Sequence, residues 1–242
     1  MRFSHLAVMG LVGVFSLTGC VFFPQEQLYQ LQPTTATELP RSGTGVEVLL
    51  GPFKLADYLQ RETLVQRQGD GTLVVNDKAR WAGDLQKDMA QLILRQLASD
   101  LDSSRLVLYP DDTGFKPELQ ITLEISRLDS GPEQPAVLEA QWRLLDSRGE
   151  MQNGRILHLR QNHDGSLSDQ VHAQGLLLQQ LSDQIASSTR PLVARLEAEK
   201  ARAARAAKEQ AALAATRKKE KEKIFKLPAS VPIRTDMEVF RF

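Results

Sequence analysis

The clearest pattern in the chain is a strict alternation of apolar and polar residues in its middle part. Three segments carry it, with apolar positions at Leu119, Ile121, Leu123 and Ile125, then Leu138, Ala140, Trp142 and Leu144, then Leu157 and Leu159. A period of two is typical of strands that bury one face. Turns are favoured between the segments at Gly131-Pro132 and at Gly149. The pattern therefore predicts an antiparallel meander with one face toward water.

Shorter strands are predicted before the meander. Val46, Val48 and Leu50 alternate, and this strand is expected to stop at Gly51-Pro52. Segments 63–66 and 72–75 are separated by Gly69-Asp70-Gly71, and the Asp-Gly step predicts a hairpin. Residues 28–31 and 106–108 are predicted as two further short strands.

Two segments place apolar residues at helical spacing. The first contains Trp81, Leu85, Met89, Leu92, Ile93, Leu97 and Leu101, with Asp77 as a candidate N-cap upstream. The second begins near Ser168 and contains Val171, 176–178, Leu181, Ile185, Leu192, Val193 and Leu196. Pro191 is expected to kink it or to start a new helical segment. We therefore predict an α+β domain over 46–196, with a mostly antiparallel sheet packed against two long helices.

The composition changes after residue 196. Residues 197–223 are rich in Ala, Glu, Lys and Arg, which favours helix but buries nothing. This charged extension is either a solvated helix or frayed linker, or a spacer that carries the tail to a partner or into the wall layer. Residues 224–242 form an apolar tail. Its end, 237–242, either adds to a sheet edge of this or a neighbouring subunit, or stays disordered until a partner arrives.

The N-terminus has the pattern of an export signal. Arg2 is followed by the apolar stretch 6–17 and by Leu17, Thr18, Gly19 and Cys20, which together form a lipobox. A transmembrane anchor is the alternative, but it needs about twenty apolar residues and this stretch has roughly twelve. We therefore predict a signal peptide over 1–19, lipidation of Cys20 and a tether over 20–45. Cys20 is the only cysteine, so no disulfide and no thiolate metal site is expected.

Charge and motif content exclude several function classes. Lys plus Arg and Asp plus Glu both number 30, so no net charge draws the chain to nucleic acid. His158, His163 and His172 lack the spacing of a metal motif. The sequence has neither a GxSxG motif nor a Gly-rich phosphate loop. We therefore expect no enzyme activity, no metal and no cofactor.

Two short motifs flank the predicted hairpin. They are YLQRETLVQR over 58–67 and RWAGDL over 80–85. In this order, and after a lipobox, they resemble the ABC-type transport auxiliary lipoproteins, the PqiC-like family. The resemblance covers about residues 20–196. It implies a homo-oligomeric ring on the outer membrane that receives the tube of an MCE-domain (mammalian cell entry) protein, which moves lipids between membranes with a membrane partner. The charged extension and tail depart from the family pattern.

Two further expectations follow from likeness to bacterial lipoproteins. Three acyl chains would hold the protein to its membrane. Val21 follows the cysteine, where an aspartate commonly signals retention in the inner membrane, so outer-membrane sorting is favoured. The rival interpretation is a freestanding structural envelope lipoprotein whose charged end binds the cell wall or an outer-membrane assembly.

The two motifs supply the candidate interface residues. If they form a subunit or tube contact, Tyr58, Arg61, Arg67, Arg80 and Trp81 are the candidates, because Tyr, Trp and Arg are enriched in protein interfaces. The alternative is that Trp81 packs in the core at the head of a helix, with Arg80 in its first turn facing solvent. Arg61 and Arg67 would then be polar positions around a short strand.

Overall fold

The structure is a computed structural model that describes residues 26–33, 38–40, 43, 45–110 and 114–225, with only the backbone at 223–225. The predicted signal peptide, Cys20 with its lipobox, and all of the apolar tail beyond residue 225 lie outside the described residues.

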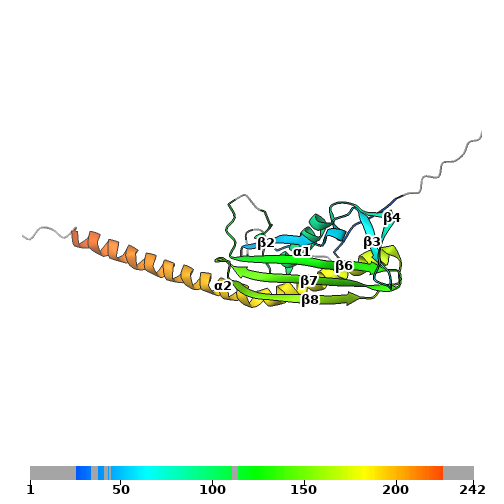
Figure 1. The fold of residues 1–242 in the computed structure, drawn as a ribbon. Coiled ribbons are helices and arrows are strands. Elements are labelled where there is room, and N and C mark those ends of the chain that lie inside the picture. Colours follow the sequence, from blue (N-terminus) through cyan, green and yellow to red (C-terminus); the bar gives the residue numbers. More distant parts are fainter. Residues whose placement is uncertain (1–25, 34–37, 41–42, 44, 111–113, 226–242) are drawn as a thin grey trace, which may run out of the picture.

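Within the described residues, eight strands form one mixed sheet (Figure 1). They are β1 (Gln27–Tyr29), β2 (Val48–Leu55), β3 (Thr63–Arg67), β4 (Leu73–Trp81), β5 (Leu106–Leu108), β6 (Leu119–Gly131), β7 (Gln134–Asp146) and β8 (Met151–Gln161). The three longest, β6, β7 and β8, form the predicted antiparallel meander.

On the side of β6 that does not pair with β7, the sheet divides into two parts. The first part of β6 pairs in parallel with β2, which in turn pairs in parallel with β5. The end of β6 meets β3 at a single residue pair, Ser130 with Gln66. β3 forms the predicted hairpin with β4, and β4 pairs in parallel with β1. We call β1, β3 and β4 the small wing; one residue pair is its only ladder contact with the rest of the sheet.

Two helices cover one face of the sheet. α1 (Leu85–Asp100) packs on β2 and β5, α2 (Leu167–Phe225) packs on β6, β7 and β8, and the two helices contact each other. One apolar core fills the space between the layers, with Trp142, Ile93 and Leu178 fully buried. The opposite face of the meander is mostly polar, as the alternation predicted, although Ile156 of β8 is exposed on it. The α+β fold class with a mostly antiparallel sheet and two long helices is therefore confirmed.

The start of the first helix was predicted wrongly. Trp81 is the last residue of β4, and α1 begins at Leu85 with Asp84 as its N-cap, whose carboxylate accepts from the Lys87 amide at 3.0 Å. Asp77, the predicted cap, lies within β4. The error has a physical reason: Trp81 faces the core from the strand end, and its distance of four residues from Leu85 imitates a helical period.

Two other predicted breaks are absent. β2 continues through Gly51-Pro52 to Leu55, because its register with β6 shifts between Leu50 and Phe53 and the proline, which has no N–H, is not needed in the ladder. α2 also continues through Pro191, which is exposed on the helix surface, so no new helical segment begins there; the alternative of a kink stays a prediction.

The second half of α2 leaves the domain. Every residue from 197 to 222 is exposed, and Figure 1 shows the helix projecting past the end of the sheet that lies opposite the small wing. From Leu196 to Phe225 this part spans about 44 Å at 1.5 Å per residue. Among the described residues, neither helix has an apolar run that could cross a lipid bilayer.

Candidate docking site

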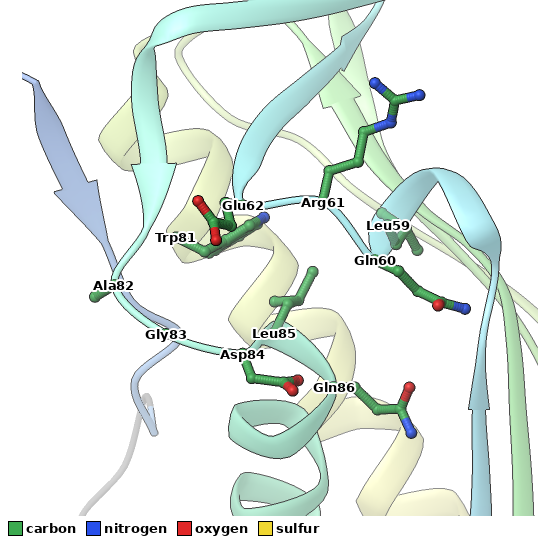
Figure 2. Close-up of a pocket in the computed structure, with 10 residues that line it drawn as sticks. All are labelled: Leu59, Gln60, Arg61, Glu62, Trp81, Ala82, Gly83, Asp84, Leu85 and Gln86. Atoms are coloured by element: carbon green, nitrogen blue, oxygen red, sulfur yellow. The ribbon is translucent and has the colours of Figure 1, made fainter.

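The two sequence motifs meet at one hollow (Figure 2). Its volume is about 580 Å³, and it is lined by Leu59, Gln60, Arg61, Glu62, Trp81, Ala82, Gly83, Asp84, Leu85 and Gln86. The first four residues come from the 3₁₀ turn η1 (Asp57–Leu59) and the loop before β3, and the others from the end of β4 and the start of α1. Segments that lie about twenty residues apart in the sequence therefore form a single surface.

Apolar residues form the floor of the hollow and backbone hydrogen bonds fix its walls. Leu59, Trp81 and Leu85 are buried, and Figure 2 shows Leu85 rising from α1 between the other two. The Trp81 amide donates to the Glu62 carbonyl at 2.7 Å, which joins the two motifs directly. The Gln86 side chain donates to the Phe53 carbonyl at 3.0 Å, which ties the first turn of α1 to β2. These hydrogen bonds hold the end of β4 against the loop before β3, and the start of α1 against β2.

Arg80 and Arg61 lie differently at the rim. Arg80 was predicted in a first helical turn facing solvent, but it lies on β4 and pairs with two carboxylates: its Nε is 3.1 Å from Glu26 and its Nη1 is 3.3 Å from Glu62. It therefore links the residue that precedes β1 to the wall of the hollow. Arg61 makes no hydrogen bond or ion pair with the described residues, and Figure 2 shows it extending away from the other labelled side chains.

Tyr58 and Arg67 converge on a carboxylate that the sequence reasoning missed, Asp129 near the end of β6. The Asp129 side chain is fully buried. Arg67 donates to it from two of its three guanidinium nitrogens, Nε at 2.9 Å and Nη2 at 2.7 Å, and Arg127 Nε donates to it at 3.0 Å. The Tyr58 hydroxyl donates to it at 2.8 Å and accepts from the Leu128 amide at 3.2 Å. We call these four side chains the Asp129 cluster.

The Asp129 cluster shifts the pKa values of its members. Burial acts to raise the pKa of Asp129, but the hydrogen bonds from Arg67, Tyr58 and Arg127 outweigh it, so the pKa lies below its usual value. Burial, together with the nearby Asp129 charge, raises the pKa of Tyr58. The hydrogen bond to Asp129 raises the pKa of Arg67. At neutral pH the carboxylate is therefore ionised and the phenol is protonated.

The position of the Asp129 cluster gives it a mechanical role. It joins the end of β3, through Arg67, and η1, through Tyr58, to β6, at the place where the small wing has one ladder contact. A polar chain continues beside it, because Gln66 donates to Gln170 of α2 at 3.0 Å and Ser130 donates to the same oxygen at 3.2 Å. The cluster thus fixes the loop that forms one wall of the hollow.

The structure therefore separates the five candidate interface residues into two groups. Arg61 and Trp81 line the hollow and Arg80 braces its rim, whereas Tyr58 and Arg67 bind Asp129 within the chain. The sequence gives little sign of this role, because Asp129 lies beyond the alternating positions 119–125 and its burial, which makes the charge need partners, is seen only in the structure. Among the described residues, no group of His, Cys, Asp or Glu side chains is placed to hold a metal ion.

Comparison with known proteins identifies the family. Residues 29–186 match the model of the family described as ABC-type transport auxiliary lipoprotein component. No curated protein matches the chain. A crystal structure of a Xanthomonas campestris protein is 13% identical, with a TM-score of 0.57 over 72% of this chain and 99% of that one. A crystal structure of an uncharacterized protein is 18% identical, with a TM-score of 0.55 over 67% and 97%. At these identities the two structures show a shared fold.

The family match includes both motifs, the hollow and the Asp129 cluster. It covers well over half of the sequence. The chain therefore belongs to the ABC-type transport auxiliary lipoproteins, membrane-anchored envelope proteins that serve a transport system.

Proposed function

We propose that this protein is a non-enzymatic subunit of an MCE-type lipid transport system, and that the hollow between the two motifs binds the transport partner. The observation that carries the proposal is the convergence of segments 59–62 and 81–86 on one surface. The two segments are also joined directly, by the hydrogen bond from the Trp81 amide to the Glu62 carbonyl and by the ion pair between Arg80 and Glu62.

The chemistry of the hollow supports docking over catalysis. Among its lining residues there is no Ser, Thr, Cys, His or Lys, so no nucleophile stands beside a base. Its two carboxylates are occupied: Glu62 pairs with Arg80, and Asp84 caps α1. The hollow instead has the composition of a protein interface: an apolar floor that includes a tryptophan, and a polar rim with Arg61, which pairs with none of the described residues.

The outer membrane and a homo-oligomer are further parts of the proposal. Val21 after Cys20 supports sorting to the outer membrane. An unpaired strand edge supports self-association: among the described residues β8 pairs only with β7, and its Met151 and Ile156 are 66% and 78% exposed. An open strand edge with exposed apolar residues is a natural site for a second copy.

Crosslinking of the native protein in cells, followed by mass spectrometry, tests the proposal. We expect an MCE-domain protein among the most abundant partners, because the hollow would hold it beside the anchored subunit. The Cys20→Ala variant is the control: without the acylated cysteine it should remain an unprocessed precursor and lose that partner. Reproducible capture of cell-wall or barrel-assembly proteins alone would contradict the transport proposal and favour a structural role.

A further inference from the structure

The charged extension is fixed to the domain only at its base. There Lys200 forms an ion pair with Glu118, the residue before β6. Every side chain from 201 to 222 is exposed, and Arg202, Arg205 and Lys208 form no ion pair with any described residue. Figure 1 shows this part of α2 running free of the sheet, away from the small wing. The helix therefore offers its whole circumference to a ligand outside its own domain.

The described part of the extension carries a strong positive charge. Residues 200–221 contain eight Lys or Arg and two Glu, a net charge of +6. Because the whole chain has no net charge, the remaining residues carry −6. Lys200, Arg202, Arg205 and Lys208 fall within nine residues that include no acidic side chain. Such a run on an exposed element is typical of a segment that binds an anionic partner.

The basic side chains surround the helix and do not gather on one face. At 3.6 residues per turn, each residue is rotated by about 100° from the one before. Lys208 and Lys219 therefore lie on one side of the helix, and Arg202 and Arg217 lie about 140° away from them. Over 200–221 no two neighbouring basic positions are more than about 80° apart around the axis. A flat surface could meet only some of these charges at a time.

The low apolar content of the extension argues against a protein groove and against a lipid bilayer. Over residues 197–222 the one large apolar side chain is Leu213, which is 57% exposed, and the remainder is alanine and polar or charged residues. The centre of a protein interface buries large apolar side chains, which this part of the helix lacks. A helix that lies on a bilayer has an apolar face opposite a basic face, and the basic residues here are not divided in that way.

We propose that the charged extension enters the cell-wall layer and binds the anionic polymer of the wall by charge. The wall is a mesh of glycan strands whose peptide branches carry carboxylates, so it can surround a helix and meet basic side chains on all sides. This contact is additional to the docking of the transport partner. It does not depend on the hollow, because it rests on the exposure, the charge and the charge distribution of a helix that leaves the opposite end of the domain.

Co-sedimentation of the full-length protein with purified cell-wall sacculi tests this proposal. We expect the protein to sediment with the sacculi, and the binding to weaken as salt is added, because exposed charges are screened. Failure to sediment with the sacculi would refute the proposal. A preference for vesicles that contain phosphatidylglycerol over pure phosphatidylcholine vesicles, without binding to sacculi, would instead assign the helix to a lipid surface.

Paired substitutions on opposite sides of the helix test whether the polymer surrounds it. Arg202→Gln with Arg217→Gln removes two charges from one side, and Lys208→Gln with Lys219→Gln removes two from the other. One exposed ion pair contributes a factor of roughly 1.5 to five, so each double variant should weaken binding to sacculi roughly two- to thirtyfold, by similar factors. A loss confined to one double variant would show contact through a single face and contradict a surrounding mesh.

Lys54→Gln with Arg143→Gln is the matched control for these variants. Both residues are exposed on the sheet, and the double variant changes the net charge of the protein by the same amount. We expect its binding to sacculi to change by less than about twofold, because these two charges lie outside the extension. An equal loss in this control would show a response to overall charge and overturn the assignment to the extension.

Discussion

Replacing Asp129 by alanine should lower the free energy of unfolding by about 3–5 kcal/mol, because it leaves Arg67 and Arg127 without their buried counter-charge and Tyr58 without its acceptor. Chemical denaturation monitored by tryptophan fluorescence measures this loss. Tyr58→Phe should cost less, about 1.5–3 kcal/mol, since it removes the hydrogen bond to the charged Asp129 and the weaker one from the Leu128 amide but leaves the ion pairs in place. Arg61→Ala is the control and should change stability by less than about 0.5 kcal/mol.

The Asp129 effect should depend on pH with a defined sign. The pKa of Asp129 is lowered in the folded protein, so its charge stabilises the fold above the ordinary carboxyl pKa near 4. That contribution is lost as the pH falls through the lowered folded value. The difference in stability between the wild type and Asp129→Ala should therefore be constant from about pH 5 to 7 and shrink below about pH 4. A difference that grew in acid would contradict an ionised, hydrogen-bonded Asp129.

Gly131→Ala should destabilise the protein by about 2–4 kcal/mol, because the junction between β6 and the small wing has no room for a side chain. A Cβ on Gly131 would lie 1.9 Å from the Arg67 carbonyl oxygen and 3.0 Å from its carbonyl carbon. Both atoms belong to the backbone, so β3 must move, and the Arg67 guanidinium moves with it. Thermal unfolding followed by circular dichroism measures the change.

Gly69→Ala is the matched control for Gly131→Ala. Gly69 lies in the hairpin loop next to β3, and the nearest atom to an added Cβ is the Gln134 side-chain nitrogen at 3.6 Å, an ordinary contact. We expect a change of less than about 1 kcal/mol. Because Gly131→Ala already displaces Arg67 from Asp129, its cost and that of Asp129→Ala should not add in the double variant. Full additivity would show that the two residues act on separate parts of the structure.

The sequence predicted those parts of the fold that depend on local periodicity. The meander, the hairpin at Gly69-Asp70-Gly71 and the buried faces of both helices each follow from residues close together in the chain. The parallel pairs of β2 with β5 and β6, and of β1 with β4, were not predicted, because the register of distant strands is set by packing. The single-residue contact between β3 and β6 was missed for the same reason.

The candidate site was predicted in part. The motif residues that line or brace the hollow were identified, but their roles were not, because Arg67 and Asp129 are 62 residues apart and nothing local pairs them. Tyr58 was interpreted as a possible partner contact, and its hydroxyl instead binds Asp129 within the chain. The burial of Asp129, which makes its charge depend on partners, is visible only once β6 is packed against its neighbours.

The most direct test of the docking proposal is site-specific photo-crosslinking in cells. A photo-reactive amino acid is placed at Arg61 or Ala82, both exposed at the hollow, and at Glu124, which is exposed on β6, as the control. We expect crosslinks to the transport-system partner from positions 61 and 82 and none from position 124. Crosslinks to that partner from position 124, with none from positions 61 and 82, would contradict the assignment of the hollow as the docking site.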